Sequence, residues 1–225
     1  MNPITVLLVE DHMIVRQGFR ALLDLEADII VVGEAHHGRE AVELTGKYKP
    51  DVVIMDIAMP VLNGVGATRQ ILEMAPGTKV LVLSAHSDDP YIQSVLEAGA
   101  AGFVIKQTSA QILSKAIREI KKGKTFFSPS IAKSIQGFRR SSSAKNPSRK
   151  RPSKGLTARE MEVIQMIAEG APNKKVASEL GISIKTVEKH RQHLMDKLNI
   201  HDTAGLTRYA IANGIIESSV QVTII

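Results

Sequence analysis

Two kinds of hydrophobic pattern divide the chain. In the first half, short apolar runs rich in β-branched residues recur without polar alternates, which is typical of strands covered on both faces of a parallel sheet. These runs are Thr5–Val9, Ile29–Val32, Val52–Met55, Val80–Leu83 and Phe103–Ile105. Segments with helical periodicity lie between them and begin near residues 13, 38, 64, 90 and 109. The pattern therefore predicts five βα units and a doubly wound α/β fold with a five-stranded parallel sheet.

From residue 156 onward the pattern is helical. Thr157 and Glu160 form a capping box, and the helix that they open is expected to end at Gly170. A short helix at 174–180 and a longer one at 184–198 follow. Two helices joined by a tight glycine-containing turn are typical of the helix-turn-helix motif, whose second helix lies in the DNA major groove. The second half is thus predicted to be a small all-α domain.

A change in composition separates the two halves. Residues 139–155 carry seven lysine or arginine residues and no acidic residue, so the net charge of +6 comes from this segment. Serine- and proline-rich sequence without apolar residues cannot bury enough surface to fold alone. We interpret it as a flexible hinge, which can also contact phosphate backbones non-specifically. The predicted organisation is an α/β domain at 1–124, a linker at 125–154 that is basic from 139, a helical domain at 155–217 and a tail at 218–225.

The composition also limits the class of protein. A hydrophobic content of 44% with 23% charged residues is typical of globular domains. The absence of cysteine excludes a disulfide framework, a thiolate metal site and a cysteine nucleophile, and it fits a reducing compartment. No stretch approaches the roughly 20 apolar residues of a membrane span. We therefore expect a cytoplasmic protein without membrane contact.

Polar residues follow four of the predicted strands at their carboxyl ends. They are Glu10 and Asp11 after the first strand, Asp56 after the third, Ser84 after the fourth and Lys106 after the fifth. Such strand ends converge beside the switch point of an open parallel sheet. Three neighbouring carboxylates repel one another unless a cation lies among them, and oxygen ligands suit Mg²⁺. With a lysine and a hydroxyl nearby, such a site can accept a phosphoryl group, and Asp56 is the expected nucleophile.

Three alternative sites are disfavoured. Aspartyl-phosphate hydrolases similar to the haloacid dehalogenase group need a second aspartate two residues after the nucleophile, where this chain has Ala58. A phosphate loop of the type GxxxxGK[ST] is also absent from the sequence. We therefore expect no enzyme activity beyond Mg²⁺-dependent phosphoryl transfer to Asp56 itself. Glu34, His36 and His37 follow the second predicted strand, and we interpret them as a surface turn rather than a metal site.

The segments that carry the first group of residues resemble the receiver domain of two-component response regulators. The segments are LLVEDH, DVVIMDIAMPVLNG, VLVLSAH and AGFVIK, and the resemblance covers about the first 120 residues. It implies a flavodoxin-like receiver fold. The implied roles are phosphoacceptor for Asp56, Mg²⁺ ligands for Glu10, Asp11, Asp56 and the backbone carbonyl of Ala58, switch hydroxyl for Ser84 and phosphoryl contact for Lys106. Phe103 takes the family's aromatic switch position without the hydroxyl of a tyrosine, so motion there would act through packing.

Helical geometry predicts two sides for the helix at 184–198. Val187, Leu194, Leu198 and Ile184 form an apolar stripe that is expected to be buried. The other side presents Lys185, Glu188, Lys189 and Gln192. Lysine can donate to guanine, glutamine can pair with adenine and glutamate can accept from cytosine. An ordinary amphipathic surface helix explains the stripe equally well.

The segment GLTAREMEVIQMIAEGAPNKKVASELGISIKTVEKHRQHLMDKLN resembles the LuxR-type helix-turn-helix domain, over about 60 residues. Together with the receiver it resembles the NarL/FixJ family of response regulators. That resemblance makes the helix with Thr186, Val187 and His190 the recognition helix, and it places Asn173 and Lys174 beside the phosphate backbone. It also implies that the last helix exposes Ala204 and Ala210 for dimerisation.

The resemblance implies a phosphorylation-dependent transcriptional regulator. A sensor histidine kinase would phosphorylate Asp56, and this would control dimerisation and binding to double-stranded promoter DNA. The alternative is a constitutive DNA-binding dimer whose receiver is only a scaffold. The acidic pair, Glu10 and Asp11, together with Lys106, favours the first hypothesis, because a scaffold needs none of them.

Overall fold

The computed structural model describes residues 2–85, 89–128, 131–132 and 156–216. The chain divides into two compact units, Met1–Lys150 and Arg151–Ile225. Most of the predicted linker and the predicted tail lie outside the described residues, so the domain boundaries remain predictions. Among the described helices, none combines the length and apolarity that crossing a membrane requires.

The described strands of the first unit form one parallel sheet in the order β2-β1-β3-β4-β5-β6. The strands are β1 (Ile4–Val9), β2 (Ile29–Ala35), β3 (Val52–Asp56), β4 (Lys79–Ser84), β5 (Gly102–Ile105) and β6 (Phe126–Phe127). The doubly wound α/β fold is confirmed, but the prediction of five strands is wrong by one. Phe126 and Phe127 pair with Gly102 and Phe103 of β5. A two-residue strand is too short to be found as an apolar run, and it lies in the predicted linker.

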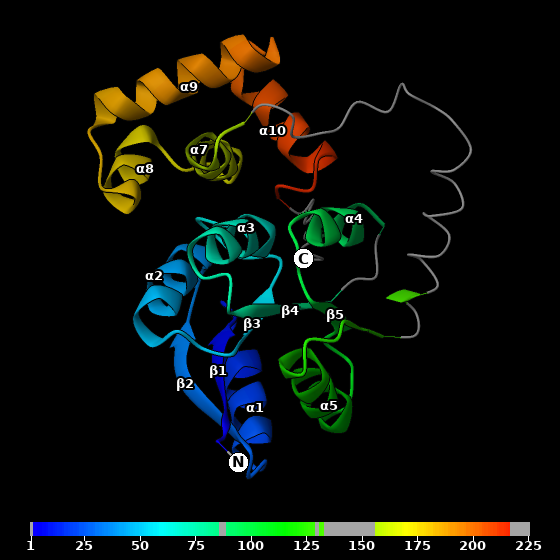
Figure 1. Ribbon diagram of the computed structural model, residues 1–225. Helices are drawn as coiled ribbons and strands as arrows, with labels where there is room; N and C mark the ends of the chain where they lie inside the picture. The colour runs from blue at the N-terminus through cyan, green and yellow to red at the C-terminus, as the bar shows by residue number, and fades with distance from the viewer. Residues whose placement is uncertain (1, 86–88, 129–130, 133–155, 217–225) are drawn as a thin grey trace, which may run out of the picture. The chain divides into compact units, whose positions relative to one another are not determined.

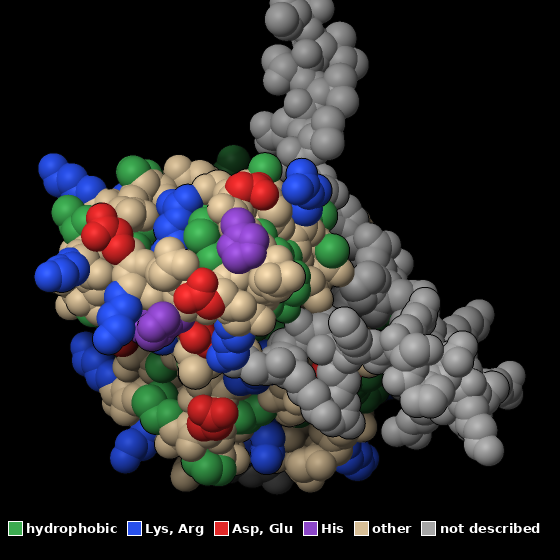
Figure 2. Space-filling model, turned by 90° about the horizontal axis from the view of Figure 1, so that it is seen from above, with side chains coloured by type: hydrophobic (Ala, Val, Ile, Leu, Met, Phe, Trp, Pro, Cys, Tyr) green, Lys and Arg blue, Asp and Glu red, His purple; other side chains and the backbone are tan. Residues whose placement is uncertain are grey.

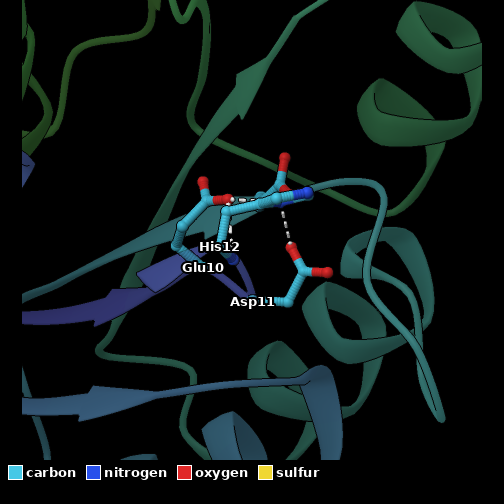
Figure 3. A group of neighbouring side chains, drawn as sticks. Glu10, Asp11 and His12 are labelled. Atoms are coloured by element: carbon cyan, nitrogen blue, oxygen red, sulfur yellow. Dashed lines mark hydrogen bonds and ion pairs between the residues drawn. The ribbon is translucent and has the colours of Figure 1, made fainter. Parts of the chain in front are cut away.

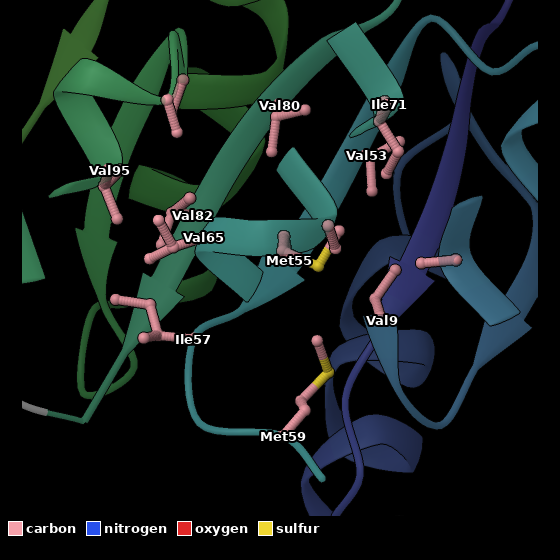
Figure 4. Close-up of a cluster of buried hydrophobic side chains, with 14 of the residues drawn as sticks. Val9, Val53, Met55, Ile57, Met59, Val65, Ile71, Val80, Val82 and Val95 are labelled. Carbon is pink, nitrogen blue, oxygen red and sulfur yellow. The ribbon is translucent and has the colours of Figure 1, made fainter. Parts of the chain in front are cut away.

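Helices cover both faces of this sheet (Figure 1). On one face lie α1 (Met13–Asp24) and α5 (Ala110–Lys121), and on the other lie α2 (Gly38–Tyr48), α3 (Gly64–Met74) and α4 (Asp89–Glu97). Alternate strand residues enter separate cores. Val53 and Met55 pack with α2, α3 and α4 in the cluster of Figure 4, whereas Val52 and Ile54 pack with α1 and α5. Burial on both faces explains why the strand sequences are almost continuously apolar.

The second unit is helical over its described residues. Its helices are α7 (Ala158–Ala168), α8 (Asn173–Leu180), α9 (Ile184–Leu198) and α10 (Thr203–Ala212). The predicted capping box is confirmed: the backbone N–H of Glu160 donates to Thr157 Oγ1 at 3.2 Å, and that of Thr157 donates to Glu160 Oε2 at 2.7 Å. Gly181 ends α8 with a φ of 62°, a left-handed conformation that glycine adopts without strain. The predicted all-α domain, with two helices joined by a glycine turn, is therefore confirmed.

Two side-chain positions predicted in this unit are wrong. In the predicted stripe on α9, Val187 and Leu194 are fully buried and Leu198 is half-buried. Ile184, however, is 45% exposed, because it is the first residue of α9 and lies at the edge of the stripe. Ala210 is fully buried rather than exposed, because α10 packs against α7.

The capping box makes a pH-dependent contribution to stability. Burial opposes the charge of Glu160, but hydrogen bonds from Lys197 Nζ and from the Thr157 backbone outweigh it, and they lower the pKa from 4.5. The stabilisation is therefore complete above pH 4.5 and is lost as the pH falls through the lowered folded-state pKa. We expect Glu160→Gln, which can still form the capping box, to cost about 1 kcal/mol at neutral pH.

Urea unfolding of the full chain as a function of pH measures this contribution. The difference in unfolding free energy between the wild type and Glu160→Gln should shrink as the pH falls below 4.5. Glu179→Gln, at an exposed position of α8, is the matched control. A difference that is independent of pH would contradict the role given to the Glu160 charge.

Candidate functional site

The candidate site lies at the carboxyl ends of the central strands. Asp56 is the last residue of β3 and Ser84 is the last residue of β4. The sheet register places Asp56 opposite Leu83, the residue before Ser84, so the two strands end at nearly the same level. Glu10 and Lys106 are the first residues after β1 and β5. The topology thus delivers all four side chains to one edge of the sheet.

Lys106 connects the two buried carboxylates of the site. Its Nζ lies 2.7 Å from Glu10 Oε2 and 2.9 Å from Asp56 Oδ1. Glu10 is 1% exposed and Asp56 is 3% exposed. The backbone N–H of Ile57 also donates to Asp56 Oδ1 at 2.8 Å. The structure therefore brings three of the predicted residues into direct contact.

Asp11 and His12 complete an acidic cluster beside Asp56. One ligand atom from each of Glu10, Asp11, His12 and Asp56 lies within 4.8 Å of the others. Figure 3 shows the His12 ring between the two neighbouring carboxylates, with Nδ1 at 2.8 Å from Asp11 Oδ1 and 3.2 Å from Glu10 Oε1. The histidine carries a positive charge only when it is protonated. Protonation of His12 would therefore reduce the net negative charge of the cluster.

Burial and neighbouring charges act in opposite directions at this site. Burial raises the pKa of Asp56 to about 6; the positive charge of Lys106 opposes this, and the negative charge of Glu10 adds to it. Burial disfavours the charged form of Lys106, but attraction to Asp56 and hydrogen bonding to Glu10 prevail and raise its pKa. Lys106 therefore remains a cation. A further positive charge near Asp56 would stabilise the ionised form of its carboxylate.

The donor set fits a divalent cation such as Mg²⁺. Glu10 Oε2 and Asp11 Oδ1 are buried, and each has one nitrogen atom close to it: Lys106 Nζ lies 2.7 Å from Glu10 Oε2, and His12 Nδ1 lies 2.8 Å from Asp11 Oδ1. Carboxylate oxygens with free lone pairs are the ligands that Mg²⁺ prefers. Glu10, Asp11 and Asp56 are therefore the residues that could hold such an ion.

Ala58 and Ser84 are the remaining residues predicted for this site. Ala58 is half-buried in the loop between β3 and α3, two residues beyond Asp56. Ser84 is 4% exposed, and its backbone carbonyl accepts a hydrogen bond from the N–H of Lys106 at 2.7 Å. This hydrogen bond joins the end of β4 to the backbone of Lys106.

The loop after Asp56 is shaped by a close backbone approach. The N–H of Gly64 donates to the carbonyl of Ile57 at 2.9 Å, and Asn63 caps α3 by accepting from the N–H of Gly66 at 2.8 Å. A Cβ atom at Gly64 would lie 2.0 Å from the backbone oxygen of Asp56. Only glycine therefore lets the start of α3 approach Asp56 this closely.

The second candidate surface is formed by α8 and α9. Five of the residues predicted to contact DNA are exposed: Lys174, Lys185, Glu188, Lys189 and Gln192. Three are half-buried: Asn173, Thr186 and His190. Thr186 and Gln192 form local hydrogen bonds: the Thr186 N–H donates to Oγ of the N-cap residue Ser183 at 3.1 Å, and Gln192 Nε2 donates to Asp196 Oδ1 at 2.9 Å. In the view of Figure 2, lysine and arginine side chains are interspersed with acidic side chains and histidine.

Comparison with protein families matches both units. Residues 6–118 match the response regulator receiver domain, and residues 154–210 match the bacterial regulatory proteins of the luxR family. The chain is a response regulator of the NarL/FixJ family. It belongs with DNA-binding transcription regulators of two-component systems rather than with catalytic enzymes.

The similarity to individual regulators extends over nearly the whole chain. This chain is 36% identical over 224 residues to the transcriptional regulatory protein DegU of Brevibacillus brevis, with 95% of each chain covered. It is 37% identical over 213 residues to the transcriptional regulatory protein LiaR of Bacillus subtilis, covering 95% of this chain and 99% of LiaR. The solved complex of the response regulator RcsB with DNA matches at 26% identity and a TM-score of 0.58, covering 94% of this chain and 99% of that one.

Three ionisable residues near the receiver site of this response regulator were not predicted to act there. His12 contacts the acidic pair, and Arg16 donates through Nη1 to the backbone oxygen of Glu10 at 2.8 Å. Glu34 lies in β2 rather than in the predicted surface turn, because this edge strand continues to Ala35, and it pairs with Arg16. The available signal was the position of Arg16, which falls on the buried face of α1.

Phe103, the predicted switch aromatic of this response regulator, is fully buried. It lies opposite Phe127 of β6, and the N–H of Ser128 donates to its carbonyl at 3.2 Å. Ile131, also fully buried, belongs to the same hydrophobic cluster. Repacking of Phe103 would therefore change the packing of Phe127 and Ile131, which follow α5 in the chain.

Proposed function

We propose that this response regulator controls transcription in response to phosphorylation of Asp56. The proposed donor is the phosphohistidine of a sensor histidine kinase, and the proposed target is double-stranded promoter DNA bound by a homodimer. The observation that carries the proposal is the position of the Asp56 carboxylate, which is buried, 2.9 Å from Lys106 Nζ and adjacent to the acidic pair. A carboxylate held among a cation and metal-binding oxygens is suited to accept a phosphoryl group.

The proposed reaction moves one phosphoryl group. An oxygen of the Asp56 carboxylate attacks phosphorus while the bond from phosphorus to the kinase histidine nitrogen breaks, and the released imidazole takes up a proton. Lys106 Nζ, which now bridges Glu10 and Asp56, pairs with a phosphoryl oxygen. The proposed Mg²⁺ ligands are Glu10, Asp11, Asp56 and the backbone carbonyl of Ala58. When bound, Mg²⁺ supplies positive charge that neutralises the phosphoryl oxygens.

The proposed switch begins with the charge of about −2 that a phosphoryl group adds at neutral pH. This charge attracts the Lys106 ammonium and the Ser84 hydroxyl, which both lie at the ends of neighbouring strands. Their movement changes the packing of Phe103 and, through it, of β6 and Ile131. The result is a shift in population toward the DNA-binding dimer.

In the proposed complex, α9 lies in the major groove of each half-site, and the two half-sites are about one duplex turn apart. Lys185, Lys189 and Gln192 are the proposed base contacts, with Glu188 accepting from cytosine and with Thr186 and His190 at the groove edge. Asn173 and Lys174, at the start of α8, contact the phosphate backbone. The existence of an RcsB–DNA complex supports this assignment for a relative with the same fold.

A mobility-shift measurement tests the proposal against the scaffold alternative. An operator is first selected from a random DNA pool with the full-length protein. Its dissociation constant is then measured with and without acetyl phosphate in the presence of Mg²⁺. We expect the phosphoryl donor to tighten binding about tenfold, since a coupling of this size is typical. Equal affinities in the two conditions would favour the constitutive dimer and contradict phosphorylation control.

Lys189→Ala is expected to weaken operator binding by about 1–3 kcal/mol, because the exposed lysine lies on the face of α9 opposite the buried stripe. Fluorescence anisotropy with the selected operator measures this loss, and phosphorylation by acetyl phosphate should be unchanged. Lys47→Ala removes an exposed lysine from α2 of the receiver and is the charge-matched control. If Lys189→Ala bound like Lys47→Ala, Lys189 would have no part in recognition.

A further inference from the structure

Arg16 is a buried charged residue on the inner face of α1. It is 7% exposed and shares that face with Phe19 and Leu23 of the hydrophobic core. Burying a guanidinium group is costly unless its donors are paired. An apolar side chain would fill the same space at a lower desolvation cost. The contacts of Arg16 therefore indicate why this position carries a cation.

Those contacts connect α1, β1 and β2. Arg16 Nη1 donates to the backbone oxygen of Glu10 at 2.8 Å, and Nε donates to Glu34 Oε2 at 3.1 Å. Glu34 lies in β2 opposite Leu8 of β1, and its other oxygen is 3.3 Å from Arg20 Nη1. The guanidinium charge is therefore balanced by a carboxylate outside the acidic cluster, while one donor is directed at the peptide that carries the acidic pair.

The backbone of Glu10 is consequently held on both sides. Its N–H donates to the carbonyl of Ala35 at 3.1 Å, and its carbonyl accepts from Arg16. The peptide plane that joins Glu10 to Asp11 is rigid, so holding this carbonyl restricts the orientation of the backbone from which both side chains leave. These side chains supply the two buried oxygens of the acidic pair, Glu10 Oε2 beside Lys106 Nζ and Asp11 Oδ1 beside His12 Nδ1. Figure 3 shows each of the two carboxylates with an oxygen turned toward the His12 ring.

We propose that Arg16 is a positioning residue for divalent-cation binding at the acidic pair. It acts through the Glu10 carbonyl and is not itself a ligand or a contact of the reacting atoms. Because Glu34 balances its charge, its effect is geometric rather than electrostatic. The inference rests on the proposed function, since it assumes that Glu10 and Asp11 bind Mg²⁺. Partners that orient metal ligands in this way typically change metal affinity by about 10- to 100-fold.

Arg16→Lys tests the geometric role, because lysine keeps the charge but carries all its donors on one nitrogen and cannot reproduce the planar fork in which Nη1 and Nε face the two acceptors. Calorimetric titration of the full-length protein with Mg²⁺ alone should give a dissociation constant about tenfold above that of the wild type. At saturating Mg²⁺, the rate of phosphorylation by acetyl phosphate should return to within about twofold of the wild type. A merely structural role would instead lower the unfolding temperature and the rate at every Mg²⁺ concentration.

Arg20→Met is the matched control, because Arg20 contacts Glu34 and Asp24 but its described contacts do not include the Glu10 peptide. Its Mg²⁺ affinity should stay within about twofold of the wild type. If Arg16→Lys unfolds, Arg16→Gln, which brings no charge into the core, is measured with the same expectation. Wild-type affinity in the Arg16 variant overturns the inference and leaves the proposed function standing. Failure of the wild type to bind Mg²⁺ overturns both.

Discussion

Asp56→Asn is expected to abolish phosphoryl uptake by the full-length protein. The amide lacks the anionic oxygen that attacks phosphorus, while Lys106 and the acidic pair stay in place. Incorporation from acetyl phosphate should fall on the order of 100-fold or more. The gain in operator affinity on adding acetyl phosphate should vanish with it. Intact-protein mass spectrometry measures the first effect, and a mobility shift with the selected operator measures the second.

The same substitution should leave the fold intact. Since burial raises the pKa of Asp56 from 3.8 to about 6, the ionised carboxylate costs folding free energy as the pH rises through that interval. An uncharged asparagine avoids this cost, so the unfolding temperature at neutral pH should be no lower than that of the wild type. Asp24→Asn, at the surface-exposed end of α1, is the control and should accept the phosphoryl group normally. Phosphate-enhanced operator binding by Asp56→Asn would show that the switch lies elsewhere.

Gly64→Ala is expected to destabilise the receiver unit by about 3 kcal/mol. The added Cβ would lie 2.0 Å from the backbone oxygen of Asp56, and a backbone atom cannot rotate away as a flexible side chain can. The loop cannot easily shift either, because the N–H of Gly64 bonds the carbonyl of Ile57 and Asn63 caps the helix. The displaced atom belongs to Asp56, so the fraction that remains folded should also be phosphorylated more slowly. Denaturant unfolding and acetyl phosphate kinetics measure the two effects.

Gly18→Ala is the matched control for this prediction. An added Cβ at Gly18, inside α1, would meet nothing within 4 Å. Alanine is a better helix former than glycine by about 1 kcal/mol, so this variant should be slightly more stable than the wild type. Unfolding of Gly64→Ala at the wild-type denaturant concentration would mean that the β3–α3 loop adjusts freely, and the close approach would then have no structural importance.

The parts of the fold that follow from local patterning were predictable. The central strands are buried on both faces, so their sequences are unbroken apolar runs. β2 was predicted too short, because Gly33 and Glu34 interrupt its apolar run at the edge of the sheet. β6 was not predicted, because two residues have no periodicity and only pairing with β5 makes them a strand. Ala210 was misplaced because its burial depends on α7, which lies far away in sequence.

The candidate receiver site shows the same division. The order of the strands determines that residues at their carboxyl ends meet, so Glu10, Asp56 and Lys106 could be grouped from sequence. The contacts among these residues could not be predicted from sequence, because the bridging position of Lys106 depends on the register between β5 and its neighbours. The role of Arg16 was hidden for a similar reason, since its acceptors come from β1 and β2.

By itself, the sequence determined the two-domain plan, the α/β and all-α classes, and the set of residues at the strand ends, because these follow from local periodicity and from the fixed handedness of βα units. The tertiary structure alone decided three contacts: the bridge between Lys106 and two carboxylates, the hydrogen bond from Arg16 to the Glu10 carbonyl and the approach of Gly64 to Asp56. Each of these contacts joins residues from different elements. Their distances are set by packing to within a few tenths of an ångström, which no local pattern encodes.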